Sequence, residues 1–242
     1  EEKIFIKAGS TNTNRKFPKK ITEPLMNYSH TLGIVGTTGS GKTVAYISLL
    51  CSPNVKGVRQ SYIGQFKTIA IICPTIKNIT HPKIKKLKHI YEGLTVQNME
   101  NVEELAIENH DAGVHTLLIL DDCASDLKTP GIVTKLNYLF STNRQMSLTI
   151  WVVSQKYNAI SAMVRQNIKQ WLFFSVDDAT ESESIQKSSL LTPKQFKMIY
   201  SKAFNTSMHT RNNFLFIDKS RSVLNKVRYF INFQEQIFII EE

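Results

Sequence analysis

The apolar residues of this chain follow two alternating patterns. Continuous apolar runs predict strands that are buried on both faces, as in a parallel sheet. Segments with an apolar residue every three or four positions predict amphipathic helices between them. The predicted strands are 31–35, 68–73, 116–121, 148–154 and 170–176, and the predicted helices are 42–51, 101–109 and 130–143. Strands that alternate with helices predict an α/β fold with a doubly wound, mostly parallel sheet.

The C-terminal part of the chain shows a different pattern. Thr192 and Gln195 form a capping box that predicts a helix through about Ala203. Residues 214–217 and 226–233 predict a hairpin that turns over 218–220, which would give the sheet an antiparallel C-terminal edge. At the other end, residues 1–24 have the composition of an N-terminal arm, and residues 25–242 are predicted to form a single domain.

The composition fits a globular protein without membrane segments. Hydrophobic residues make up 42% of the 242 positions, which is enough for a full core. No apolar stretch approaches the roughly 18 residues of a membrane span, and residues 1–7 lack the apolar core of a signal peptide. The three cysteines are isolated in the sequence, so they indicate neither a disulfide framework nor a zinc cluster. We therefore expect a soluble, intracellular protein.

The predicted strand at 31–35 leads directly into a glycine-rich loop with the pattern G-x-x-x-x-G-K-[ST]. The glycines let successive backbone N–H groups point at the oxygens of a polyphosphate. The lysine reaches the β- and γ-phosphates, and the hydroxyl that follows it ligates Mg²⁺. The pattern therefore predicts a P-loop. Its nucleotide-binding residues are Gly36, Thr37, Thr38, Gly39, Ser40, Gly41, Lys42 and Thr43.

Two carboxylates follow the apolar run at 116–120 and provide a second element of a nucleotide site. Asp121 and Asp122 are placed at the end of a predicted buried strand, as in a Walker B motif. In that role, Asp121 holds Mg²⁺ directly or through water, and Asp122 polarises the attacking water as a general base. The same pattern also fits an ordinary strand followed by a turn, but the P-loop some 80 residues upstream favours the Walker B interpretation.

The charge balance indicates a polyanionic partner. The chain has 30 Lys and Arg residues against 20 Asp and Glu residues, a formal net charge of +10. Binding to nucleic acid by counterion release fits this excess, although lysines on a solvated surface would give the same balance. Part of the excess positive charge is a cluster of lysines at residues 83–88, which is either a DNA contact or a solvated helix face.

A third element narrows the class of ATPase. Gln155 ends the predicted strand 148–154, and Arg144 comes just before that strand. An amide at this position can contact both the γ-phosphate and the attacking water, which is a sensor role. On its own, Gln155 is more typical of a surface strand end than of a sensor, and the spacing of the whole set of motifs favours the sensor role.

The ordered set of motifs resembles the FtsK–HerA superfamily of ring-forming, DNA-pumping ATPases. The small size is similar to the branch of viral genome-packaging ATPases of nucleocytoplasmic large DNA viruses, virophages and tectivirus-like phages. The resemblance covers about Thr31 to Ile217 and implies a RecA-like P-loop NTPase fold. The motifs that carry it are the P-loop, LLILDD at 117–122, NRQMSLTI at 143–150, Ser154–Gln155 and VRQNI at 164–168.

The resemblance also implies roles for single residues. Lys42 and Thr43 would bind the nucleotide and the metal, with Asp121 as a further Mg²⁺ ligand. Asp122 would be at the general-base position, where many relatives have Glu, and Gln155 would be the sensor. An ATPase of this kind uses ATP with Mg²⁺ as its cofactor.

An arginine finger that enters the neighbouring subunit's site is implied as well. Arg144 is the first candidate and Arg165 the second. Either residue would instead fit an ion pair within its own subunit.

The family implies partners and a location. The partners would be double-stranded DNA without sequence preference, further copies of the chain in a pentameric or hexameric ring, and capsid vertex proteins. The place of action would be the virus factory in the host cytoplasm, or the packaging vertex of the virion. For DNA contacts, the loops 124–130, with Lys128, and 156–165 are the candidates.

Other functions share part of this pattern. A GTPase or a small-molecule kinase also has a P-loop, but the chain lacks an N-K-x-D tetrapeptide and neither class accounts for the charge of +10. A scaffold that binds ATP without hydrolysing it is disfavoured by the complete set of Lys42, Thr43, Asp121 and Asp122. Within the motor class, chromosome segregation and conjugative coupling remain alternatives to genome packaging.

Overall fold

A ten-stranded sheet is the frame of the molecule, and its order is β1-β10-β9-β8-β7-β2-β6-β5-β3-β4. The computed structural model describes residues 5–9, 25–52, 61–62, 64–78, 81–204, 213–220, 227–233 and 235–240. The strands are β1 (Phe5–Gly9), β2 (Thr31–Val35), β3 (Thr68–Ile72), β4 (His89–Tyr91), β5 (Thr116–Asp121), β6 (Leu148–Ser154), β7 (Gln170–Phe174), β8 (Phe214–Asp218), β9 (Arg228–Ile231) and β10 (Glu235–Ile240).

The sheet has a parallel half and an antiparallel half. Strands β7, β2, β6, β5, β3 and β4 are parallel, and β8, β9, β10 and β1 continue the sheet beyond β7 with antiparallel pairs. Every residue of β2, β5, β6 and β7 is buried, which explains their continuous apolar sequences. The predicted α/β class, with an antiparallel C-terminal edge, is confirmed.

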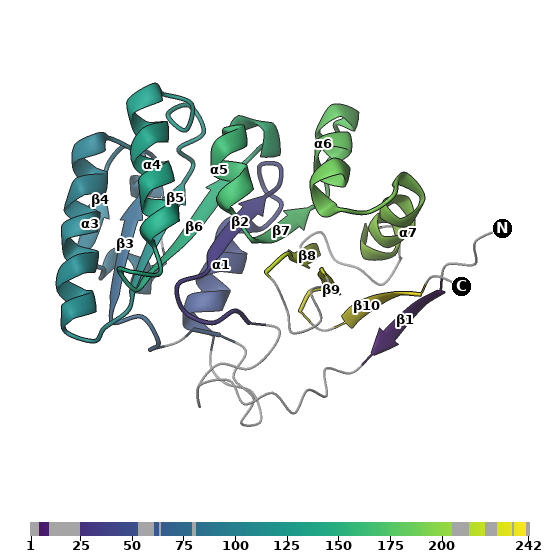
Figure 1. Ribbon diagram of the computed structural model, residues 1–242, viewed down its shortest axis with the longest axis horizontal. Coiled ribbons are helices and arrows are strands. Elements are labelled where there is room, and N and C mark those ends of the chain that lie inside the picture. The colour runs from purple at the N-terminus through teal and green to yellow at the C-terminus, as the bar shows by residue number, and fades with distance from the viewer. Residues whose placement is uncertain are drawn as a thin grey trace.

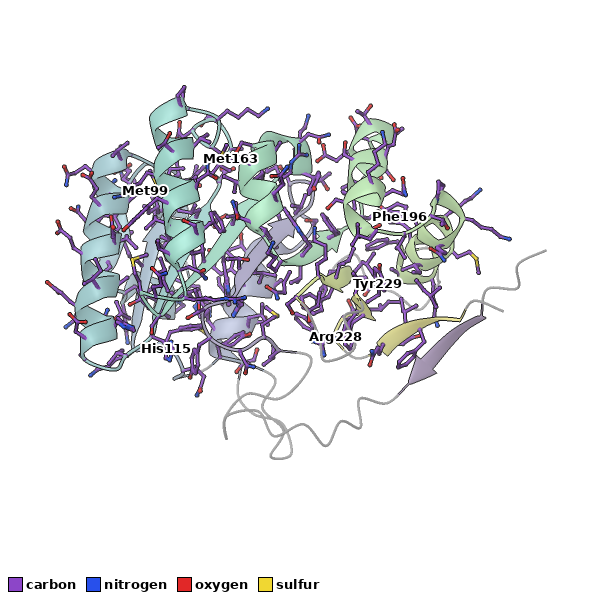
Figure 2. All side chains as sticks on the ribbon, viewed as in Figure 1. Met99, His115, Met163, Phe196, Arg228 and Tyr229 are labelled. Carbon is purple, nitrogen blue, oxygen red and sulfur yellow. The ribbon has the colours of Figure 1, made fainter. Side chains whose placement is uncertain are left out.

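Helices cover both faces of the sheet, so the fold is doubly wound. One core layer contains residues of α3 to α7, and the other contains residues of α1 and α2. Met99 of α3 and Phe196 of α7 mark the two ends of the first layer (Figure 2). Figure 1 shows α3, α4 and α5 side by side in front of the parallel strands. The helices are α1 (Lys42–Cys51), α2 (Pro82–Lys85), α3 (Val96–Asp111), α4 (Pro130–Thr142), α5 (Ala162–Asn167), α6 (Ala179–Ser189) and α7 (Pro193–Phe204).

Two helix starts show how local sequence determines the elements. The helix predicted over 101–109 begins earlier, at Val96, because the Thr95 hydroxyl accepts a hydrogen bond from the Asn98 N–H at 3.1 Å. The predicted capping box before α7 is present in both directions. The Thr192 N–H donates to the Gln195 side chain at 3.0 Å, and the Gln195 N–H donates to the Thr192 hydroxyl at 3.3 Å.

The antiparallel half is larger than the sequence predicted. The β8–β9 pair is the predicted hairpin, while the segment 221–226 between them lies outside the described residues. Beyond it, β10 pairs with β9 and with β1. Residues 5–9 of the predicted N-terminal arm therefore form an edge strand of the sheet, and the other residues of 1–24 lie outside the described part.

His30, just before β2, links the sheet to the loop at 25–30. Trp151 donates its indole N–H to Nε2 of His30 at 2.8 Å, so Nδ1 carries the ring proton and donates to the Asn27 carbonyl at 2.6 Å. Burial lowers the pKa of His30 from 6.5 to about 4. The folded protein therefore needs this imidazole neutral.

Acid should destabilise the protein through His30. Its stabilising contribution is complete above pH 6.5 and is lost as the pH falls from 6.5 to about 4. The cost should reach about 3 kcal/mol of unfolding free energy, since each pKa unit is worth about 1.4 kcal/mol. Urea unfolding of wild type and His30→Gln across this range measures it. The wild-type slope with pH should exceed the variant's by about one proton, and equal slopes would contradict the assignment.

Candidate functional site

The P-loop connects β2 to α1 in a conformation that needs glycine. Gly39 and Gly41 have φ angles of 77° and 100°, in the left-handed region that glycine adopts without strain. At Gly36, a Cβ atom would come within 2.6 Å of both the Phe174 Cβ and the Ser40 Oγ. The predicted loop is therefore required by the backbone as well as by phosphate chemistry.

The order of the strands brings the predicted motifs together. Strand β6 lies between β2 and β5, and the register places Val35 beside Ser154 and Asp121 beside Val153. The carboxyl ends of these three parallel strands thus meet at one edge, where ligands of open α/β sheets bind. Gly36, Asp122 and Gln155 follow directly on those ends.

Gln155 forms a bridge across this edge. Its amide NH₂ donates to Oδ1 of Asp122 at 3.0 Å, and its Oε1 accepts a hydrogen bond from the Thr38 hydroxyl at 3.1 Å. The side chain is exposed, so it has access to solvent and to a ligand. Both the P-loop and the general-base candidate are therefore within hydrogen-bond distance of one amide.

Lys42 folds back over the loop that precedes it. Its ammonium group donates to the carbonyl of Gly36 at 2.6 Å and to that of Thr37 at 2.8 Å. Burial lowers the pKa of Lys42, and the charges of Asp121 and Asp122 act against this shift. The ammonium is held at the centre of the loop, where it can exchange these carbonyls for phosphate oxygens.

Asp121 is positioned by a tyrosine that the sequence analysis missed. The hydroxyl of Tyr46, on the buried face of α1, donates to Oδ2 of Asp121 at 3.0 Å. Burial raises the pKa of the Asp121 carboxyl, and the bond from Tyr46 opposes that rise. Tyr46 comes three residues after Thr43 on the same helix, so it connects the P-loop helix directly to the predicted metal carboxylate.

Asp122 has an unusual backbone conformation. Its φ angle is 56°, in the left-handed region that aspartate and asparagine tolerate better than most residues. Its N–H still donates to the Val153 carbonyl at 3.3 Å, so the chain turns away from β5 while it stays attached to β6. The turn aims the Asp122 side chain at Gln155 rather than into the core.

A pocket of about 590 Å³ occupies this edge of the sheet. Its lining includes Lys42, Thr43, Asp121, Asp122 and Gln155. A further part of its wall comes from the segment after β3 and from the start of α2, with Thr75, His81 and Pro82. Sequence reasoning gave no signal for this wall, because no motif marks it.

The donor set suits Mg²⁺. Thr43 offers an exposed hydroxyl, and Asp121 has one carboxylate oxygen left beside the one that Tyr46 occupies. Hydroxyl and carboxylate oxygens are hard ligands, and Mg²⁺ takes one or two of them together with water and phosphate oxygens. When bound, Mg²⁺ would neutralise phosphate charge at this point. Among the described residues, no group of three or more His, Cys, Asp and Glu side chains could hold a metal.

Neither arginine candidate lies in this pocket. Arg144 is exposed in the turn between α4 and β6, at the amino end of a strand whose other end carries Gln155. Seven residues of strand separate the two ends by about 20 Å. Arg165 stays within its own subunit, since its Nη1 donates to Asn158 at 2.8 Å and its guanidinium lies 4.5 Å from the centre of the Tyr157 ring.

The family of the chain follows from a comparison with protein-family models. The model described as "Poxvirus A32 protein" matches residues 19–240. The chain belongs to the poxvirus A32 protein family. This match includes the whole site described above and agrees with the predicted resemblance to a viral family. No curated protein sequence was found to match.

Solved structures of a protein of a Sulfolobus virus share this fold. The genome packaging NTPase B204 of Sulfolobus turreted icosahedral virus 2, in complex with sulfate, superimposes with a TM-score of 0.56 at 16% identity. The match covers 84% of this chain and 96% of that one. The complex of B204 with ATP-gammaS gives a TM-score of 0.55 at 17% identity, over 84% and 98% of the two chains. At these identities the comparison shows the fold alone.

The site and the family together make this A32-family chain a P-loop ATPase. It has a phosphate loop, paired carboxylates and an amide that bridges them, all lining one pocket. In the described part of the chain, no helix has the length and apolar character needed to span a membrane.

Proposed function

We propose that the chain is a ring-forming, Mg²⁺-dependent ATPase that drives double-stranded DNA into a viral capsid. The observation that carries the proposal is the bridge of Gln155 between Thr38 and Asp122, because it completes a hydrolytic site in a chain of the A32 family. The structures that share its fold are of a genome packaging NTPase, which supports the same role here.

Hydrolysis would proceed by in-line attack of water on the γ-phosphate. Asp122 accepts the proton of that water, and Gln155 orients it against the P-loop. Lys42 supplies positive charge to the β- and γ-phosphates, which stabilises the charge that develops in the transition state. Thr43 and Asp121 would hold Mg²⁺, with Tyr46 keeping the Asp121 carboxylate in place.

DNA contacts are proposed on the same edge of the sheet as the ATP site. Lys128, after β5, and Lys156, directly after Gln155, are exposed there. Lysine side chains bind phosphates as point charges without reading bases, so they suit a motor that must move any sequence. The formal charge of +10 agrees with this partner.

The assembly and its place of action are part of the proposal. A pentameric or hexameric ring would surround the DNA, with capsid vertex proteins as the docking partner. Packaging would occur in the virus factory of the host cytoplasm or at the vertex of the virion. An alternative within the same superfamily is a translocase for segregation or conjugation, which would act on DNA without a capsid.

Binding to duplex DNA should be independent of sequence and steeply dependent on salt. For about six phosphate contacts, the affinity should fall on the order of 10³-fold between about 50 mM and 200 mM salt, because each contact releases condensed counterions. Fluorescence titrations with two unrelated duplexes measure this, and a single-stranded oligonucleotide is the control. An affinity that stays flat across this salt range, or a strong preference for one duplex, would exclude the proposed role.

A further inference from the structure

The positive charge of the chain is concentrated in one segment. Between Pro24 and Tyr91 there are nine lysine and arginine residues and no aspartate or glutamate. This segment alone accounts for nine units of the formal charge of +10, so the rest of the chain is nearly neutral. The segment is therefore a strongly basic part of the chain.

Three exposed lysines lie close together at and just after α2 in this segment. We call Lys85, Lys86 and Lys88 the α2 lysines; all three are exposed. In the described part of the chain, none of them has an ion pair, whereas the nearby Lys77 binds Glu92 at 3.0 Å. Three like charges within four residues repel one another, and an anionic partner would relieve that repulsion.

The segment that carries the α2 lysines is anchored to the ATP site. His81 and Pro82, at the start of α2, form part of the pocket wall. The N–H groups of Ile84 and Lys85 donate to the His81 carbonyl at 3.0 and 3.2 Å, and the Ile84 side chain is only 2% exposed. The lysines are therefore held at a defined place beside the pocket.

The chain after the α2 lysines is anchored as well. It continues into β4, which pairs with β3, and the Cys73 N–H donates to the Tyr91 carbonyl at 3.0 Å. Strand β3 in turn pairs with β5, the strand that ends in Asp121. The α2 lysines are thus connected through β4 and β3 to the strand that carries Asp121.

We propose that the α2 lysines bind the phosphate backbone of duplex DNA beside the ATP pocket. The proposal rests on the proposed function and names a contact surface for the same motor. Duplex DNA fits better than a small anion because each of its strands carries a phosphate every ~3.4 Å along the helix axis, so several lysines can each contact a different phosphate. His81 lines the ATP pocket and lies only four to seven residues before the α2 lysines. The helix α2 and the residues next to it would therefore carry both the DNA contact and part of the pocket wall.

The test compares two triple variants that remove the same charge. Lys85→Gln/Lys86→Gln/Lys88→Gln removes the α2 lysines, and Lys187→Gln/Lys194→Gln/Lys197→Gln removes three exposed lysines from α6 and α7, which cover the other face of the sheet. Both variants should keep the ATPase rate measured without DNA. The first should bind duplex DNA more than about tenfold more weakly at 0.1 M salt, with a salt slope lower by up to ~2.7, and the second should bind nearly as wild type.

Other results would contradict the proposed DNA contact of the α2 lysines. Equal losses in both triple variants would mean that only net charge matters, and no loss in the first would mean that DNA binds elsewhere; either result overturns the proposal and leaves the packaging role standing. If wild type itself shows no salt-dependent duplex binding, the proposed function fails as well. If the first variant keeps DNA binding but loses binding to an acidic protein, the α2 lysines are a protein contact instead.

Discussion

Replacing Asp122 with asparagine should leave ATP binding intact and lower the turnover of hydrolysis about 10²-fold or more. Asparagine tolerates the left-handed backbone conformation of this residue, and its Oδ1 can still accept the bond from Gln155. The substitution therefore removes the proton acceptor with little change of shape. A phosphate-release assay gives the turnover, and a fluorescent ATP analogue gives the affinity.

Two further variants separate the roles of the paired carboxylates. Asp121→Asn should weaken binding of Mg²⁺–ATP, because it removes the charge that Tyr46 holds in place. Asp122→Glu should retain more activity than Asp122→Asn, because it keeps a carboxylate at the position. If Asp122→Asn hydrolyses ATP normally and Asp121→Asn binds Mg²⁺–ATP normally, the Walker B interpretation is wrong.

The parallel half of the sheet could be predicted because strands that are buried on both faces have continuous apolar sequences. Strands such as β5 and β6 are buried on both faces, so their residues are continuously apolar and the runs are visible without an alignment. Helix α6 has no such run: its sequence ATESESIQKSS is mostly polar, and its buried residues are Glu181, Ile185 and Ser189. Its buried polar side chains are satisfied by hydrogen bonds, some of them to distant parts of the chain, as when Glu181 accepts from the Asn158 N–H, so the packed face has no apolar pattern.

Pairing between the two ends of the chain is also invisible to local patterns. Strands β1 and β10 pair although residues 5–9 and 235–240 are at opposite ends of the chain. No periodicity in either segment indicates that the two segments pair. The same holds for short strand β4, whose three residues are too few to show a pattern. Such contacts are determined by the whole fold.

The site was predictable to the extent that its residues follow directly on strand ends. Gly36, Asp122 and Gln155 follow directly on the ends of β2, β5 and β6, which are neighbouring parallel strands, so these residues meet at one edge of the sheet. Tyr46 and His81 could not be found in this way. Tyr46 looks like any buried helix position until its hydroxyl is seen beside Asp121, and His81 lies just before the short helix α2, where no motif marks it.

The structure changes the balance between the two arginine candidates. Arg165 is bound to Asn158 and stacked on Tyr157, so its guanidinium has a structural role in its own subunit. Arg144 is exposed, and in the described part of the chain it forms no ion pair. Since the length of β6, about 20 Å, separates Arg144 from its own γ-phosphate site, a direct contact of Arg144 with a γ-phosphate would have to be made in a neighbouring subunit. In a ring with head-to-tail interfaces, the surface around each ATP site contacts a different surface of the neighbouring subunit, so that subunit can supply a residue to the site.

Arg144→Ala subunits should be inactive alone, with turnover reduced on the order of 10³-fold, yet regain activity when mixed with Lys42→Ala subunits. In such rings the Lys42→Ala subunits supply the arginine, and the Arg144→Ala subunits supply the intact P-loop. Random mixing at equal amounts would make about a quarter of the interfaces complete, so recovery should approach a quarter of the wild-type rate. ATPase assays over a range of mixing ratios should give a maximum near equal amounts.

Arg165→Ala is the matched control, because its side chain contacts its own subunit and should give no recovery with Lys42→Ala beyond its own rate. Exchange of labelled subunits must first be seen, so that mixed rings are known to form. Specific activity of wild type should also rise with protein concentration over the range in which the ring assembles. If mixed rings form and Arg144→Ala gains nothing from Lys42→Ala, Arg144 does not act across the interface, and the trans arginine must come from another part of the chain.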